Sequence, residues 1–272
     1  MTRGTTTKIG MALISFVLGM TIMSLLWTPH DPLAIDAENS LAPLSLSHPF
    51  GTDMLGRDVL SNIIVGARST LLVAMLSVTI AMVIGVIAGV AGAMLGYRSR
   101  TLLVFVIDIV LALPGVLLAI VLAAVYGPST ITATVAIGVA LSAAVAQVTR
   151  RAAMAVLAQD FVLAAIASGS SRPRLILRHV LPNLRANLLI QASGAAAIAI
   201  LAESTLSYLG LGTVPPTPSW GRMLADSQQF LILDPIVALW PGLFIAMAVL
   251  GFNLLGDGLR EESDSTLDTD IA

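Results

Sequence analysis

Several kinds of residue are scarce or absent in this chain, and each absence removes a class of function. Cysteine does not occur among the 272 residues, which excludes disulfide bonds, thiolate metal sites and cysteine nucleophiles. Charged residues make up only 11% of the chain, whereas soluble proteins carry about a quarter. The net charge is −2 and no basic block occurs, which argues against nucleic acid as a partner.

The few polar residues also lack the spacings of the common catalytic and nucleotide-binding motifs. Lys8 is the only lysine, and its surroundings, GTTTKIG, do not form a phosphate-binding loop. The three histidines are His30, His48 and His179. No two of them lie one helical turn apart with a glutamate between them, as in helical zinc motifs. We therefore predict a chain without enzymatic activity, and without a bound metal or other cofactor of its own.

Apolar residues make up 57% of the chain, more than one water-soluble core of this size can hide. The sequence therefore predicts an all-α integral membrane protein with six transmembrane helices. These are expected at residues 9–27, 70–96, 101–126, 131–149, 187–208 and 236–255, with Pro114 as a kink in the third. A secretory signal is the alternative for the first run, but that run is long and no small-residue cleavage site follows it.

The region between the first two spans ends in a stretch of mixed character, residues 48–70. Charged residues recur in it at helical spacing among apolar ones: Asp53, Arg57, Asp58 and Arg68. This pattern predicts an interfacial amphipathic helix that precedes the second span.

Glycines mark one face of the second span. Gly85, Gly89, Gly92 and Gly96 follow one another at spacings of four, three and four. Such a face of small residues lets a neighbouring helix approach closely, so we predict tight helix packing here rather than a ligand site.

Two acidic residues lie inside predicted spans, where a charge is costly and often functional. Asp108 lies about 10 Å into the third span, and Glu203 lies about 24 Å into the fifth, near its outer end. For Asp108 we expect an ion pair with an arginine at the rim of the membrane: Arg98, Arg100 or Arg150. For Glu203 we expect a buried, hydrogen-bonded anchor of the outer loop. The alternative for both is a role in a transport path.

The longest polar interruption between apolar runs, residues 160–183, reads as a helix, a glycine break and a second helix. The first helix is expected to present one face at spacings of three and four: Met154, Leu157, Phe161, Ala165 and Ser168. Gly169 is expected to end this helix, Pro173 suits the first turn of the next, and Pro182 is expected to stop it. A docking surface and an amphipathic linker on the bilayer fit this pattern equally well.

Basic residues flank the predicted spans unevenly, which predicts their orientation. The side with both termini carries eleven of them: Arg3, Lys8, Arg98, Arg100, Arg150, Arg151, Arg172, Arg174, Arg178, Arg185 and Arg260. The other side carries Arg57, Arg68 and Arg222. We therefore expect both termini and residues 160–183 in the cytoplasm.

The run LAAIASG, followed ten residues later by HVLPN, resembles the cytoplasmic "EAA" signature of ABC-importer permeases. That signature is E-A-A, three residues, a glycine and a downstream H-x-L-P-N. Leu163 stands where the family has glutamate, and Ile166 stands where a basic residue is common. The resemblance implies coupling to an ATPase through Asp160, Phe161, Leu163, Ala164, Ala165, Gly169, Ser170 and Ser171.

Three further stretches carry a more specific resemblance. They are HPFGTDMLGRDVLSNIIVGARSTLL at 48–72, ESTLSYLGLGTVPPTPSWGRML at 203–224 and FNLLGDGLRE at 252–261. All three resemble the second (C-type) permease subunit of dipeptide, oligopeptide and nickel ABC importers. On this basis the chain divides into a tail (1–8), a first span with its outer loop (9–69), a five-helix core (70–256) with a coupling segment (150–186), and a second tail (257–272).

The resemblance implies the type I ABC importer permease fold and a mechanism shared among several subunits. A second permease completes the path, one or two ATPase subunits carry ATP and Mg²⁺, and an extracytoplasmic binding protein delivers the substrate. Family substrates include di- and oligopeptides, glutathione, nickel and haem. The expected location is the bacterial cytoplasmic membrane, as a multi-pass protein.

Two other classes of function fit the composition of the chain. One is a self-contained, proton-coupled secondary transporter that uses Asp108 and Glu203, and the other is a structural membrane subunit without a transport path. Neither accounts for the helix pair at residues 160–183.

Overall fold

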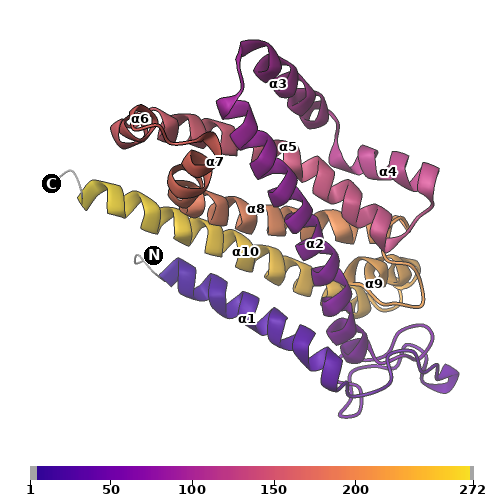
Figure 1. Cartoon of the computed structure of the whole chain (residues 1–272). Helices are drawn as coiled ribbons and strands as arrows, with labels where there is room; N and C mark the ends of the chain where they lie inside the picture. Colours follow the sequence, from indigo (N-terminus) through magenta and orange to yellow (C-terminus); the bar gives the residue numbers. More distant parts are fainter. Residues whose placement is uncertain (1–4, 270–272) are drawn as a thin grey trace.

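The computed structural model describes residues 5–269, with side chains to residue 262, and most of this part of the chain is helical (Figure 1). The α-helices are α1 (Thr5–Leu26), α2 (Val59–Met94), α3 (Tyr97–Ala112), α4 (Gly115–Tyr126), α5 (Thr130–Leu157), α6 (Asp160–Ala167), α7 (Arg172–Leu175), α8 (Leu181–Tyr208), α9 (Trp220–Ser227) and α10 (Ile236–Thr269). A π-helical turn, η2 (Ile176–Val180), joins α7 to α8. Short 3₁₀ turns lie at Ala37–Asn39 and Gln228–Phe230. Five helical runs of the described residues are long and apolar enough to cross a membrane: α1, α2, α5, the run from α7 to α8, and α10. The bent pair of α3 and α4 makes a sixth if the two helices form one broken span, as the prediction of six spans requires.

The pair of α2 and α5 forms the centre of the fold, and its glycines let the two backbones approach closely. A Cβ atom at Gly85 would lie 2.6 Å from the Cβ of Val145, and one at Gly89 would lie 2.6 Å from the Cβ of Thr149. The predicted packing face is therefore confirmed for these two glycines, and Gly92 continues it against the side chain of Arg150. Gly96 does not belong to the face, because α2 has already ended and this residue precedes α3.

The first and last long helices also pack as a pair and run side by side in Figure 1. A Cβ atom at Gly10 would lie 2.7 Å from the backbone nitrogen of Leu255, and one at Gly251 would lie 3.1 Å from the side chains of Leu13 and Ile14. Residues early in α1 therefore meet residues late in α10, which makes the pair antiparallel.

The third predicted span is not a single kinked helix. Its two halves, α3 and α4, form an angle of 87° and lie together at one edge of the molecule (Figure 1). Pro114 has no N–H to donate and disfavours a helical conformation at the residue before it. Leu113 is accordingly extended, with ψ at 123°. In α3 only Ile107 is buried, so this edge of the described structure has few neighbours.

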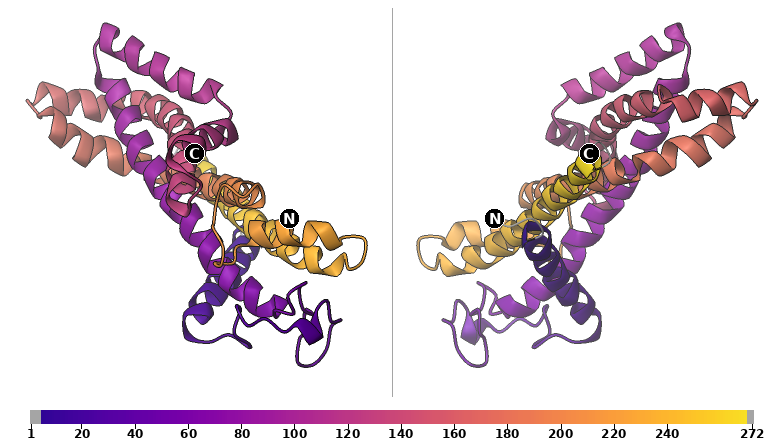
Figure 2. Two further views of the ribbon diagram at one scale, coloured as in Figure 1. Left: turned by 90° about the vertical axis from the view of Figure 1, so that its right-hand side faces the viewer. Right: turned by 90° about the vertical axis from the view of Figure 1, so that its left-hand side faces the viewer.

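The prediction of an interfacial amphipathic helix at residues 48–70 is wrong. Asp53 and Arg57 lie in a loop, which Figure 2 shows beyond the ends of α1 and α2. Gly51 and Gly56 turn this loop with positive φ angles of 74° and 73°, a conformation that favours glycine. Asp58 then caps α2, which runs without a break through the predicted boundary at residue 70. The charges at helical spacing therefore come from a tight loop and a helix cap.

Candidate functional site

The segment that resembles the coupling motif begins with a break between two helices. The face predicted from Met154 to Ser168 does not lie on one helix, because α5 ends at Leu157 and Gln159 adopts an extended conformation. The short helix α6 then starts at Asp160. Figure 1 shows α6 and α7 at the end of the molecule that also holds the two chain termini.

Gly169 ends α6 in the predicted way. Its φ angle is +84°, and the backbone N–H groups of Gly169 and Ser170 donate to the carbonyls of Ile166 and Ala165, both over 3.0 Å. These two bonds form a Schellman motif, which satisfies carbonyl groups that a helix end leaves free. Ser171 occupies the N-cap position of α7 without a capping bond from its side chain, so the turn depends on the glycine.

The second helix does not stop at Pro182, contrary to the prediction. α7, the π turn and α8 form one helical run from Arg172 to Tyr208. In the π turn the N–H of Leu181 donates to the carbonyl of Ile176, five residues earlier. This wider turn accommodates Pro182, which has no N–H to donate and whose ring would clash with a backbone carbonyl in a regular α-helix.

The hairpin formed by α6 and α7 has one anchored face and one open face. Val162 and Leu175 are buried and pack with Val156 of α5 and Leu184 of α8. The expected coupling residues are mainly on the open face, where the apolar side chains of α6 have no covering element among the described residues. Exposed are Asp160, Phe161, Leu163, Ala164, Gly169 and Ser171, while Ala165 and Ser170 are half-buried.

At the opposite end, Glu203 ties the loop after α8 back to its helix. This carboxyl group is 1% exposed. Its Oε1 atom accepts hydrogen bonds from the hydroxyls of Ser207, over 2.7 Å, and Thr213, over 3.2 Å. The Ser207 hydroxyl oxygen also accepts the backbone N–H of Thr213, over 2.9 Å. These hydrogen bonds join the loop after α8 to that helix, and the choice between a structural anchor and a role in the transport path stays a prediction.

Beside this anchor, a cavity of about 250 Å³ opens between the loop after α1 and the loop around α9. Two arginines and two aspartates line it and form ion pairs. Arg57 contacts Asp53 over 2.7 Å, and Arg222 contacts Asp226 over 3.0 Å. Burial raises the pKa of the Asp226 carboxyl, although the charges of Arg222 and Arg57 act in the opposite direction. The cavity is also lined by three prolines of the loop before α9: Pro215, Pro216 and Pro218.

Asp108 does not form the expected ion pair. It lies exposed in α3, and none of Arg98, Arg100 and Arg150 forms a salt bridge with it in the described part of the chain. Arg150 instead lays its side chain over Gly92, on the face of α5 that meets α2.

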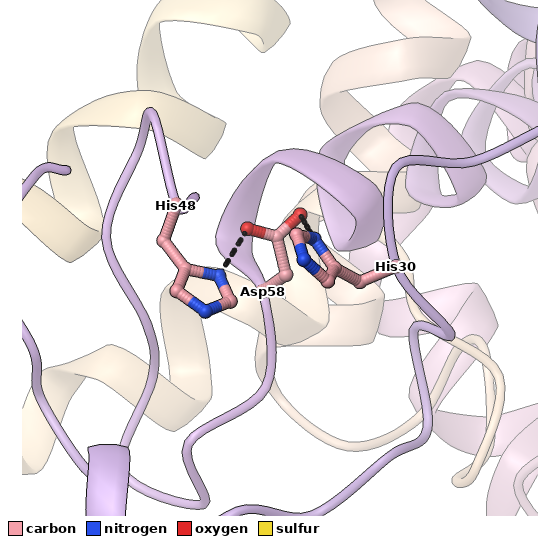
Figure 3. Close-up of side chains that lie close together, drawn as sticks. All are labelled: His30, His48 and Asp58. Carbon is pink, nitrogen blue, oxygen red and sulfur yellow. Dashed lines mark hydrogen bonds and ion pairs between the residues drawn. The ribbon is translucent and has the colours of Figure 1, made fainter. Parts of the chain in front are cut away.

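The structure also gathers three residues whose proximity the sequence did not reveal: His30, His48 and Asp58 (Figure 3). The two histidines lie 18 residues apart in a loop, so they do not have the one-turn spacing of helical zinc motifs. Hydrogen bonds from Ser61 and His48 outweigh the effect of burial on Asp58, so its pKa lies below the ordinary value. The sequence signal that pointed to part of this cluster was the HPFGTD…GRD block, because it places both His48 and Asp58 just before the start of α2.

The fold and its exposed hairpin define a multi-pass helical protein of the ABC-importer permease class. Residues 81–267 match the family described as binding-protein-dependent transport system inner membrane component. The chain belongs to this family and is a permease subunit of an ABC transporter.

Relatives of known name agree with this assignment over most of the chain. The dipeptide transport system permease protein DppC of Alkalihalophilus pseudofirmus is 37% identical over 256 residues, which cover 94% of this chain and 84% of that protein. The protein of the same name from Escherichia coli K12 is 38% identical, covering 95% and 88%. Among solved structures, the MetNI methionine ABC transporter in an inward-facing conformation matches with a TM-score of 0.61 at 16% identity, covering 72% of this chain and 94% of that one. This last likeness concerns the fold.

Proposed function

We propose that this chain is one of two permeases of an ATP-driven importer for dipeptides or short oligopeptides. The observation that carries the proposal is its identity of 36–42% with peptide permeases, over 80–96% of its length. Nickel, haem and glutathione, which the sequence resemblance also allowed, are alternative cargoes for the uptake experiment below.

ATP hydrolysis belongs to partner subunits in this proposal, because the chain has no phosphate-binding loop. The ATPases dock on the hairpin of α6 and α7, where Phe161, Leu163 and Ile166 expose 44–51% of their surface. Exposed apolar side chains on a helix anchored from beneath fit a partner interface. Leu163 brings no charge to this contact, so apolar fit supplies the docking energy.

The same proposal places both termini and the hairpin in the cytoplasm. The excess of basic residues on that side supports this orientation, and the structure has α6, α7 and the two termini at one end (Figure 1). The loop of residues 27–58 and the region around α9 then face outward. They form the surface at which an extracytoplasmic binding protein delivers substrate.

Uptake into reconstituted vesicles tests this function. The complete transporter, with its second permease, ATPases and binding protein, is supplied with a labelled dipeptide, a labelled tripeptide, glutathione, nickel or haem. We expect ATP-dependent uptake of peptide, and no uptake when the ATPase subunits are replaced by variants that do not hydrolyse ATP. Peptide uptake that persists with inactive ATPases and stops when an ionophore removes the proton gradient would contradict the proposal.

A further inference from the structure

Two of the three histidines of this chain meet one buried carboxylate at the start of α2 (Figure 3). The Nδ1 atom of His48 lies 3.0 Å from Oδ1 of Asp58, and the Nδ1 atom of His30 lies 3.6 Å from Oδ2. The two imidazole rings are neighbours as well, with centroids 4.6 Å apart. Both histidines therefore direct the same kind of nitrogen to one carboxylate.

These distances are close to the spacing of ligands around a small divalent ion. Zinc binds histidine nitrogen and carboxylate oxygen at about 2.0–2.2 Å, which places tetrahedral ligands about 3.3–3.6 Å from one another. One ligand atom from each residue lies within 4.8 Å of the other two. The side chain of His30 is 41% exposed, so an ion can reach the three residues from solvent.

A second layer of hydrogen bonds holds the three residues in place. Ser61 donates its backbone N–H and its hydroxyl to Oδ2 of Asp58, over 2.8 and 2.6 Å. The Ser61 hydroxyl oxygen also accepts the backbone N–H of His30, over 3.0 Å, and the Ser45 hydroxyl oxygen accepts that of His48. Such outer partners orient the ligands of metal sites in proteins.

Hydrogen bonds among the three residues do not account for the position of the His30 ring. The contact of 3.6 Å between His30 and Asp58 is too long for a hydrogen bond. The ring nitrogens of His30 form no hydrogen bond with the described residues. Oδ1 of Asp58, which contacts only His48, keeps a free lone pair beside it.

We propose that His30, His48 and Asp58 bind one divalent transition-metal ion of the zinc class, with the fourth position open to water. Two imidazoles and one carboxylate suit zinc, nickel and copper better than magnesium or calcium. The ion joins the loop of residues 27–58 to the first turn of α2. This site does not depend on the proposed cargo, and it lies far from the α6–α7 hairpin.

Zinc titration of the assembled transporter tests the site. The complex is stripped with a chelator, placed in lipid nanodiscs and titrated with Zn²⁺, followed by calorimetry and elemental analysis. His30→Phe removes the ligand nitrogen but keeps a ring against His48, so the fold is retained. His179→Ala, in the π turn at the other end of the molecule, is the matched control. We expect wild type and His179→Ala to bind one more zinc equivalent than His30→Phe.

Two further measurements separate a built site from unspecific binding. Ser61→Ala keeps the backbone bond to Asp58 but removes the hydroxyl that joins Asp58 to His30, and we expect about 10- to 100-fold weaker zinc binding. Co²⁺ in the wild-type site is expected to show the intense visible absorption of four-coordinate cobalt, absent in His30→Phe. Equal zinc stoichiometry and affinity in wild type, His30→Phe and Ser61→Ala would overturn the proposal.

Discussion

The indole N–H of Trp220 donates a hydrogen bond over 3.0 Å to the backbone carbonyl of Ile63, 157 residues earlier in the chain. Trp220 is fully buried, and its backbone N–H also reaches the hydroxyl of Thr70, over 3.3 Å. The first residue of α9 is therefore fixed to α2 at two points. A Cβ atom at Gly221, the next residue, would overlap the backbone of Ser204 in α8, so α9 is held between the two long helices.

Two substitutions of this tryptophan are expected to destabilise the protein to different extents. Trp220→Phe removes the hydrogen bond and should cost about 1 kcal/mol, whereas Trp220→Ala also leaves a cavity and should cost about 3–5 kcal/mol. Trp27→Phe is the control, because Trp27 is 60% exposed. Thermal unfolding in detergent measures all three. Equal shifts of Tm for Trp27→Phe and Trp220→Phe would show that the clamp contributes nothing.

The contact of α2 with α5 predicts opposite outcomes for two glycines of the same sequence pattern. Gly89→Ala forces a methyl group to within 2.6 Å of Thr149 and 2.7 Å of the Ala146 carbonyl, an overpacking that typically costs about 1–3 kcal/mol. Gly96→Ala places its methyl group in open space and should leave Tm unchanged. The yield of folded protein and Tm measure the difference. A tolerated Gly89→Ala would mean that the helices separate at little cost.

Gly169 should tolerate asparagine but not valine. The space around it is open, so only its φ angle of +84° restricts the side chain. A β-branched residue is strained there by about 1–2 kcal/mol, while asparagine visits this conformation readily. We expect Gly169→Val to insert normally, to co-purify with less ATPase subunit and to lose substrate-stimulated ATP hydrolysis, and Gly169→Asn to keep both. Full coupling in Gly169→Val would remove this turn from the docking surface.

Asp226 should make the outer region less stable as its carboxyl group ionises. The folded-state pKa lies above the ordinary value of 3.8, so the folded protein holds the proton to a higher pH than the unfolded chain does. Stability is therefore expected to fall as pH rises through the interval between these two values. Asp226→Asn should lack this dependence, and unfolding followed from pH 3 to pH 7, roughly the carboxyl range, measures it. A stability difference between the two proteins that does not vary with pH would contradict the prediction.

The absence of cysteine makes the proposed orientation directly testable. Ser40→Cys lies in the loop after α1 and Ser171→Cys lies at the start of α7, both exposed. An impermeant thiol reagent added to intact cells should label position 40, and should label position 171 only after the membrane is opened. The reverse pattern would place the termini and the hairpin outside.

Much of the architecture was predictable because single residues restrict the chain locally. Gly169 favours a turn because of its positive φ angle, Pro173 suits the first turn of a helix, and long apolar runs indicate spans. The break before α4 was placed correctly at Pro114, but the angle of 87° depends on what α3 and α4 pack against. Local sequence does not contain that information.

The remaining errors arise because the spacing of residues in the sequence does not show how the folded chain packs. Charges at 53, 57 and 58 recur at helical spacing, yet two glycines with positive φ angles bend that stretch into a loop. Pro182 was expected to end a helix, and a π turn carries the helix past it. The cluster of His30, His48 and Asp58 was hidden for a related reason, since the path of a loop brings its members together and their sequence spacing does not.

The antiparallel pairing of α1 with α10 sets an order of events during synthesis. Gly10 leaves the ribosome about 240 residues before Gly251, against which its helix packs. At about 5–20 residues per second, this interval is roughly 12–48 s. During this interval, the side of α1 that carries Gly10 faces lipid or an insertion factor in place of α10. Truncation within α10 therefore leaves α1 without its partner, which makes quality control of the newly made protein sensitive to this late-synthesised helix.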